Sequence, residues 1–197
     1  SETQPQVQEA VRSILEKVRE EGDRAIAYYE KKFDQYEPET FLVSEEEAER
    51  AKDNLPGDIV DEIDYSVKRA TSFARIQRDS LVEFEKELLP GQIVGQKLIP
   101  LESCGCYAPG GRYPSITSAI LTIVAAKAAG VKRIIACSPP GPKGAIDSGV
   151  LYAIHKIGVN EIYCFGGAQA IGAFAYGTET IKPVDFVVGP GNQYVNE

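Results

Sequence analysis

The chain has 197 residues, of which 43% are hydrophobic and 25% are charged, and its net charge is −8. This composition is typical of a soluble globular protein with a sizeable core, and it excludes an intrinsically disordered chain. The sequence has no apolar run of the roughly 18 residues that a membrane-spanning helix needs, and its N-terminus has no signal-peptide pattern. We therefore expect a cytoplasmic protein without a membrane partner.

The charge changes along the sequence. Residues 1–89 carry 23 acidic and 13 basic side chains, whereas residues 90–197 carry 6 and 8. This change near Pro90 predicts a helical N-terminal unit over residues 1–89 and a Gly-rich α/β unit over residues 90–197. Neither range has a cluster of Lys and Arg, so we do not expect nucleic acid to be a partner.

The first range has the pattern of several helices. Apolar residues recur at helical spacing over residues 7–33, and Gly22 divides this stretch into two helices. Ser44 and Glu47 form a capping-box pattern for a third helix. We expect the charged side chains here to lie on solvated faces. A fourth, longer helix is predicted after Pro56-Gly57, with this apolar stripe: Ile59, Ile63, Val67, Ala70 and Phe73.

The second range alternates strands and helices. Short extended segments surround Pro90-Gly91 and lead into the strand CGCYAP. Strands are then predicted at 133–138, 161–167 and 184–190, and helices at 115–130, 144–158 and 168–177. Short apolar strands separated by helices indicate a parallel sheet covered on both faces. The predicted fold class is therefore α/β, with a helical N-terminal unit followed by a Rossmann-like parallel βαβαβ sheet.

The reactive residue types do not form a recognisable catalytic or metal-binding pattern. The four cysteines form no CxxC pair, and His155, the one histidine, falls inside a predicted helix. We therefore interpret the thiols as reduced, buried and apolar in character. No GxSxG elbow is present either. We assign no catalytic residue and no metal ligand within the sequence.

Four Gly- and Pro-rich loops follow the predicted strands, at residues 107–112, 138–142, 166–169 and 189–192. Ligands of an open parallel sheet bind beyond the carboxyl ends of its strands. Glycine lets a ligand approach the backbone closely, and a helix start binds phosphate. The candidate binding side chains in these loops are Tyr107, Gln169 and Asn192. The alternative roles are a core or rim aromatic for Tyr107, a helix-start polar residue for Gln169 and a helix cap for Asn192.

Three stretches of the sequence resemble the N-terminal half of histidinol dehydrogenase. They are YAPGGRYPSITSAILTIVAAKAAGVKRIIACSPP, FGGAQAIGAFAYGTETIKPVD and GPGNQYVNE, and the resemblance extends over roughly residues 8–197. It implies a fold similar to that of aldehyde dehydrogenases and a zinc-dependent homodimer. It also implies that NAD is the cofactor for two successive oxidations of a small-molecule substrate, L-histidinol, to L-histidine in histidine biosynthesis.

The same resemblance implies roles for individual residues. Tyr107, Gln169 and Asn192 occupy the positions that contact NAD in this family. The zinc ligands and the Glu-His acid–base pair of the family lie beyond residue 197. The last segment, VVGPGNQYVNE, stops within what would be the first turn of a helix. We therefore expect a fragment that is inactive by itself.

Other functions stay open at this point. The segment from Arg112 to Ser115 also looks like relatives of histidinol dehydrogenase that oxidise other small alcohols, including sulfonated diols. A short non-enzymatic binding module with the same fold is a second alternative. A phosphate-binding α/β protein unrelated to NAD is a third, and it depends on the Gly-rich loops alone.

Overall fold

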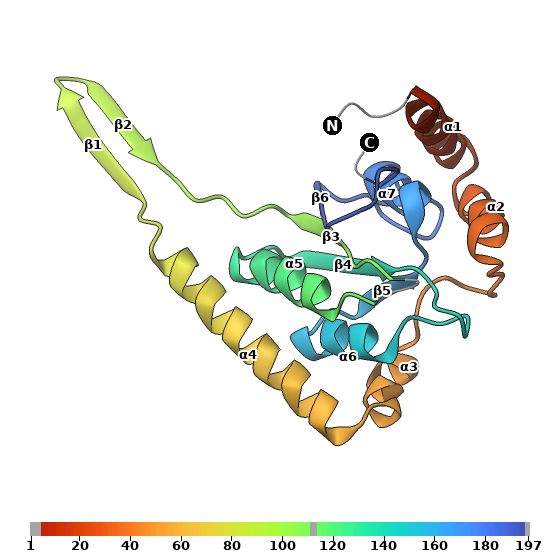
Figure 1. Ribbon diagram of the computed structural model, residues 1–197. Coiled ribbons are helices and arrows are strands. Elements are labelled where there is room, and N and C mark those ends of the chain that lie inside the picture. The colour runs from red at the N-terminus through yellow and green to blue at the C-terminus, as the bar shows by residue number, and fades with distance from the viewer. Residues whose placement is uncertain (1–4, 111–113, 196–197) are drawn as a thin grey trace.

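A four-stranded parallel sheet forms the centre of the computed structural model, which describes residues 5–110 and 114–195. The strand order is β5-β4-β3-β6. Helices cover both faces of the sheet (Figure 1), so the predicted α/β fold with a Rossmann-like parallel sheet is confirmed. The strands are β3 (Ser103–Tyr107), β4 (Arg133–Ser138), β5 (Glu161–Cys164) and β6 (Phe186–Val188).

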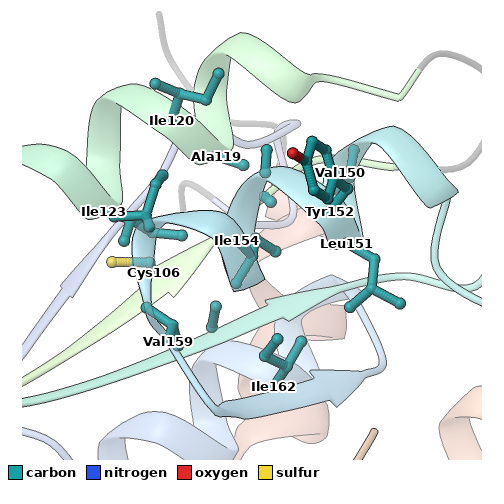
Figure 2. Close-up of a cluster of buried hydrophobic side chains, with 14 of the residues drawn as sticks. Cys106, Ala119, Ile120, Ile123, Val150, Leu151, Tyr152, Ile154, Val159 and Ile162 are labelled. Carbon is teal, nitrogen blue, oxygen red and sulfur yellow. The ribbon is translucent and has the colours of Figure 1, made fainter. Parts of the chain in front are cut away.

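Two helices, α5 (Ile116–Ala128) and α6 (Ser148–Ile157), cover one face of the sheet. Figure 2 shows their apolar side chains gathered with those of the strands below them. Ile123 and Ile154 are completely buried in this cluster. A third helix, α4 (Gly57–Asp79), packs against the outside of α5 and α6. Burial of this apolar surface is the main stabilising contribution on this side.

The opposite face is covered by α7 (Gly167–Tyr176), with α1 (Pro5–Glu21) and α2 (Asp23–Asp34) packed against it. Phe174 of α7 lies directly over β3, and a Cβ atom added to Gly105 would lie 2.5 Å from its ring. The glycine in the CGC strand is therefore needed for the close approach of helix and strand. Gly22 separates α1 from α2 with φ 54, which confirms the predicted break.

The helices of the first range share their cores with the sheet. The predicted boundary near Pro90 falls in the turn of a hairpin made by β1 (Phe84–Leu89) and β2 (Gln92–Gln96). This hairpin projects from the body as an arm (Figure 1). The short helices α3 (Glu45–Arg50) and η1 (Ala51–Asn54) join the cluster under α6. The change in composition therefore coincides with the hairpin arm. The hydrophobic clusters on the two faces of the sheet each contain residues from before and after this arm.

The buried stripe of α4 differs from the predicted one. Ile59 is 39% exposed and Phe73 is 62% exposed, so these two assignments were wrong. The side chains that face the core are Val60, Ile63, Val67, Ala70 and Ala74. This set follows the helical period more closely, because it alternates steps of three and four residues.

Within the described ranges, no helix combines the length and the apolar character that a bilayer crossing requires.

Helix starts follow their capping residues. Ser44 Oγ accepts a hydrogen bond of 3.1 Å from the Glu47 backbone N–H, as the capping-box pattern predicts. The helix predicted over residues 144–158 begins later, at Ser148. The reason is that Asp147 Oδ1 accepts from the backbone N–H groups of Gly149 and Val150, which fixes the N-cap.

The four cysteines lie in or beside the strands, and all are buried free thiols, as expected. Burial raises the pKa of the Cys137 thiol well above its ordinary value. Burial also raises the pKa of Cys164 to about 12. A protonated, buried thiol packs as a small apolar group.

Truncation of a core side chain tests which residues stabilise this fold. Ile154 is completely buried between α6 and the sheet, whereas Leu121 on α5 is 58% exposed. We expect Ile154→Ala to lower the free energy of unfolding by about 2–5 kcal/mol, through lost burial and the remaining cavity. The matched control Leu121→Ala should change it by less than about 0.5 kcal/mol. Urea denaturation monitored by circular dichroism measures both. Similar losses in the two variants would contradict the assigned core.

Candidate functional site

The turns that follow the four parallel strands touch one another along the carboxyl edge of the sheet. A Cβ atom added to Gly166, after β5, would lie 2.6 Å from Pro139 Cβ, after β4. One added to Gly110, after β3, would lie 3.0 Å from Pro139 Cγ. One added to Gly189, after β6, would overlap the carbonyl oxygen of Tyr107. Each turn therefore contacts its neighbour in the sheet, and glycine permits each contact.

Tyr107 ends β3 and joins it to the turn after β5. Its side chain is 6% exposed, and its hydroxyl oxygen accepts a hydrogen bond of 3.3 Å from the Gly167 backbone N–H. Burial raises the pKa of Tyr107 to about 12, so the hydroxyl stays protonated at neutral pH. Tyr107 is thus a buried aromatic at the sheet edge that holds two turns together.

Gln169 lies in the first turn of α7 and is 1% exposed. Its Nε2 donates a hydrogen bond of 2.9 Å to Glu30 Oε1. Its Oε1 accepts no hydrogen bond from the part of the chain that the structure describes. A Cβ atom added to Gly167 would lie 2.5 Å from that Oε1. Gln169 and Tyr107 are therefore brought together on the two sides of Gly167.

Asn192 lies in the turn after β6, and its side chain is exposed. Its Oδ1 accepts hydrogen bonds from the backbone N–H groups of Tyr194 (2.9 Å) and Val195 (3.2 Å). This is the capping role that was the alternative interpretation of Asn192. Its turn approaches Tyr107 at Gly189, but no hydrogen bond among the described residues joins Asn192 to Tyr107 or Gln169.

Glu30, on α2, is a buried residue of this edge that the sequence analysis missed. It is 0% exposed, and its Oε1 accepts from the Gly166 backbone N–H (3.0 Å) as well as from Gln169 Nε2. Desolvation raises the pKa of Glu30 to about 7, and the two hydrogen bonds partly oppose this shift. The expectation that charges of the first range lie on solvated faces was wrong here. The available signal was the position of Glu30 four residues after Ile26, on the buried face of α2.

Buried polar atoms without a partner accumulate at this edge. In the described part of the chain, three buried side-chain atoms lack a hydrogen-bond partner: Glu30 Oε2, Ser138 Oγ and Gln169 Oε1. Ser138 ends β4 and is 1% exposed. Buried polar groups are normally hydrogen bonded, so each of these atoms calls for an explanation. All three belong to residues at the carboxyl edge or in contact with it.

The potential metal ligands do not converge. Across residues 5–110 and 114–195, no three His, Cys, Asp or Glu side chains lie close enough to hold a metal ion. His155 lies near the end of α6, just before β5 begins, and so belongs to the opposite, amino edge of the sheet. Arg112 and Tyr113, which carry part of the resemblance, lie outside the described residues.

Comparisons with known proteins show which family the chain is similar to. The family described as histidinol dehydrogenase matches residues 1–197. A histidinol dehydrogenase homolog from Shouchella clausii is 42% identical, over 97% of this chain and 45% of its own length. Histidinol dehydrogenase from Methanosarcina mazei is 41% identical, over 96% of this chain and 43% of its own length. Sulfopropanediol 3-dehydrogenase from Ruegeria pomeroyi is also 41% identical, over 97% of this chain and 44% of its own length.

The fold is shared with a solved member of the same family. The crystal structure of histidinol dehydrogenase from Elizabethkingia anophelis superposes with a TM-score of 0.89 at 34% sequence identity. The match covers 96% of this chain and 43% of that one, so the chain spans less than half the length of the relatives it matches. Because the family match extends over every residue and the topology agrees, the chain belongs to the histidinol dehydrogenase family.

Proposed function

We propose that this chain forms the nucleotide-binding part of an NAD-dependent dehydrogenase that oxidises L-histidinol to L-histidine in two successive steps. The observation that carries the proposal is the row of glycine contacts between the four turns at the carboxyl edge. In parallel α/β sheets, nucleotides bind at this edge. Membership of a family described as histidinol dehydrogenase supports the reaction class.

Three residues are proposed to contact the nucleotide: Tyr107, Gln169 and Asn192. NAD, when bound, accepts a hydride from the substrate. Gln169 Oε1 is a buried acceptor without a partner among the described residues, and Asn192 offers an exposed amide. Tyr107 holds Gly167, where α7 begins without a side-chain cap. The N-terminus of a helix carries partial positive charge, so α7 would attract the pyrophosphate of a dinucleotide.

We propose that the 197-residue chain binds NAD weakly and does not oxidise an alcohol by itself. Removal of a hydride from an alcohol requires a base for the hydroxyl proton. The described edge offers Glu30 as its buried carboxyl, and that group is already engaged with Gly166 and Gln169. Zinc does not fit the described residues, because no three potential ligands converge there. We therefore assign no step to a metal on these residues.

A second substrate class has a specific observation in its favour. The sulfopropanediol 3-dehydrogenase of Ruegeria pomeroyi is as similar to this chain as the histidinol dehydrogenase of Methanosarcina mazei, at 41% identity each. We therefore keep a sulfonated diol as the alternative substrate. NADH formation by the complete gene product with L-histidinol or with sulfopropanediol separates the two. Activity with neither substrate would favour a non-enzymatic binding module.

NAD titration of the ¹⁵N-labelled chain tests the site directly. We expect shifts of the backbone amide resonances of Gly167, Gln169 and Asn192. Asn192→Ala should weaken binding about five- to tenfold, since one hydrogen bond contributes about 1 kcal/mol. The neighbouring exposed Gln193 provides the control, and Gln193→Ala should leave the affinity unchanged. Perturbations confined to other parts of the chain would refute the assignment of the site.

We further propose that the active protein is a cytoplasmic homodimer with a small-molecule substrate and no nucleic-acid partner. The arm carries large apolar side chains that the chain itself does not cover: Phe84, Leu88, Leu89 and Ile93, each 47% to 64% exposed. Exposed apolar surface of this kind marks an interaction site. The arm projects away from the body (Figure 1), where a second copy can reach it.

Charge placed on the arm tests this proposal. Leu88 and Ile93 are 62% and 64% exposed, so a double variant Leu88→Glu/Ile93→Glu should fold normally. We expect it to reduce the concentration-dependent self-association of the chain at least about tenfold, because burial of a carboxylate in an apolar contact is unfavourable. Lys86→Glu, an exposed charge change on the same arm, is the control. Sedimentation equilibrium measures the self-association constants of the wild type and of both variants. A complete gene product that remains monomeric at all concentrations would contradict the proposal.

A further inference from the structure

We propose that Glu30 is a positioning residue for the nucleotide site, in that its carboxylate fixes which end of the Gln169 amide is presented to the ligand. This inference rests on the proposed function, because it concerns how Gln169 would meet NAD. Glu30 comes from α2, far from the turn in sequence, and is completely buried against it. Its role is indirect, since it acts through Gln169 and the turn.

The hydrogen-bond chemistry of the two side chains gives the argument. An ionised carboxylate can only accept hydrogen bonds, whereas a glutamine amide has one end that donates and one that accepts. Glu30 Oε1 must therefore face Gln169 Nε2, as the 2.9 Å contact shows. Gln169 Oε1 is then directed away from Glu30 and has no partner within the described chain. The carboxylate thus selects the acceptor end of Gln169 for the ligand.

The same oxygen of Glu30 also fixes the turn. It accepts from the Gly166 backbone N–H at 3.0 Å, and the next residue, Gly167, donates to Tyr107. Two successive peptide N–H groups are thereby held in place by side chains from α2 and β3. The second oxygen, Glu30 Oε2, lacks a hydrogen-bond partner in the described residues.

The surroundings of Glu30 shift its ionisation toward neutral pH. The titratable groups that face it are Asp34, the last residue of α2, Tyr36, which follows α2, and three from the sheet: Tyr107, Cys137 and Cys164. None of these is a cation, and burial raises the pKa of Glu30 to about 7. Protonated Glu30 can donate to Gln169 Oε1, which favours the reversed amide and removes that acceptor from the ligand. Orientation of Gln169 should therefore be fixed above neutral pH and lost below it.

A pH titration of the ¹⁵N-labelled chain tests the role of Glu30 without any ligand. We expect the Gly166 backbone amide and the Gln169 side-chain amide to titrate together with a midpoint near the pKa of Glu30. In Glu30→Gln both should be insensitive to pH. The matched control is Glu9→Gln, an exposed acid on α1, which should behave as the wild type. Resonances of Gly166 and Gln169 that do not titrate in the wild type would overturn the proposal, and this result does not require the variant to fold.

NAD affinity as a function of pH tests the consequence for binding. Between about pH 8 and about pH 6, we expect the wild-type affinity to fall about tenfold, since one hydrogen bond to the acceptor is lost. The affinity of Glu30→Gln should be nearly constant over this range, and that of Glu9→Gln should follow the wild type. An affinity of the wild type that is independent of pH would overturn the positioning role. Absence of NAD binding in every variant at every pH, with the amide titration intact, would overturn the proposed function and the inference with it.

Discussion

The contact between neighbouring turns at the carboxyl edge of the sheet is the constraint on which the candidate site depends. The four parallel strands end at one edge, where a Cβ atom at Gly166 would lie 2.6 Å from Pro139 in the turn after β4. A Cβ atom at Gly189 would overlap the carbonyl oxygen of Tyr107 at the end of β3. Side chains from outside the sheet reinforce this arrangement. Tyr107 binds Gly167, and Glu30 binds Gly166 and Gln169. The edge is therefore a preorganised surface of closely packed turns.

The helices of residues 1–89 pack directly against the turns and helices of residues 90–197. The helix α2 supplies Glu30 to a turn more than a hundred residues later in the chain, and α1 packs on α7, which begins at that turn. A substitution in the helical range can therefore alter the ligand edge through α7. This coupling also explains why an acid occurs on the otherwise apolar face of α2.

Much of the fold could be predicted from local patterns. The strand RIIACS coincides with β4, and the break at Gly22 and the Ser44 cap are where the sequence indicates them. These features depend on neighbouring residues and on the alternation of apolar segments. The stripe of α4 was partly wrong, because Ile59 and Phe73 have the right chemistry but lie one position away from the buried face. The face of α4 that is buried depends on its tertiary contacts, and these cannot be derived from the periodicity of the sequence alone.

The candidate site was predictable in outline only. The sequence places Tyr107, Gln169 and Asn192 in strand-following turns, and the structure joins the first two around Gly167. The sequence could not show that Gln169 is buried against Glu30, because that contact joins residues 139 positions apart. The most direct measurement of the central claim is a crystal structure of the complete gene product with NAD. The account predicts that NAD lies across the turns at Gly166-Gly167 and Gly189, with Gln169 Oε1 within hydrogen-bonding distance. NAD bound at the amino edge of the sheet, near His155, would contradict it.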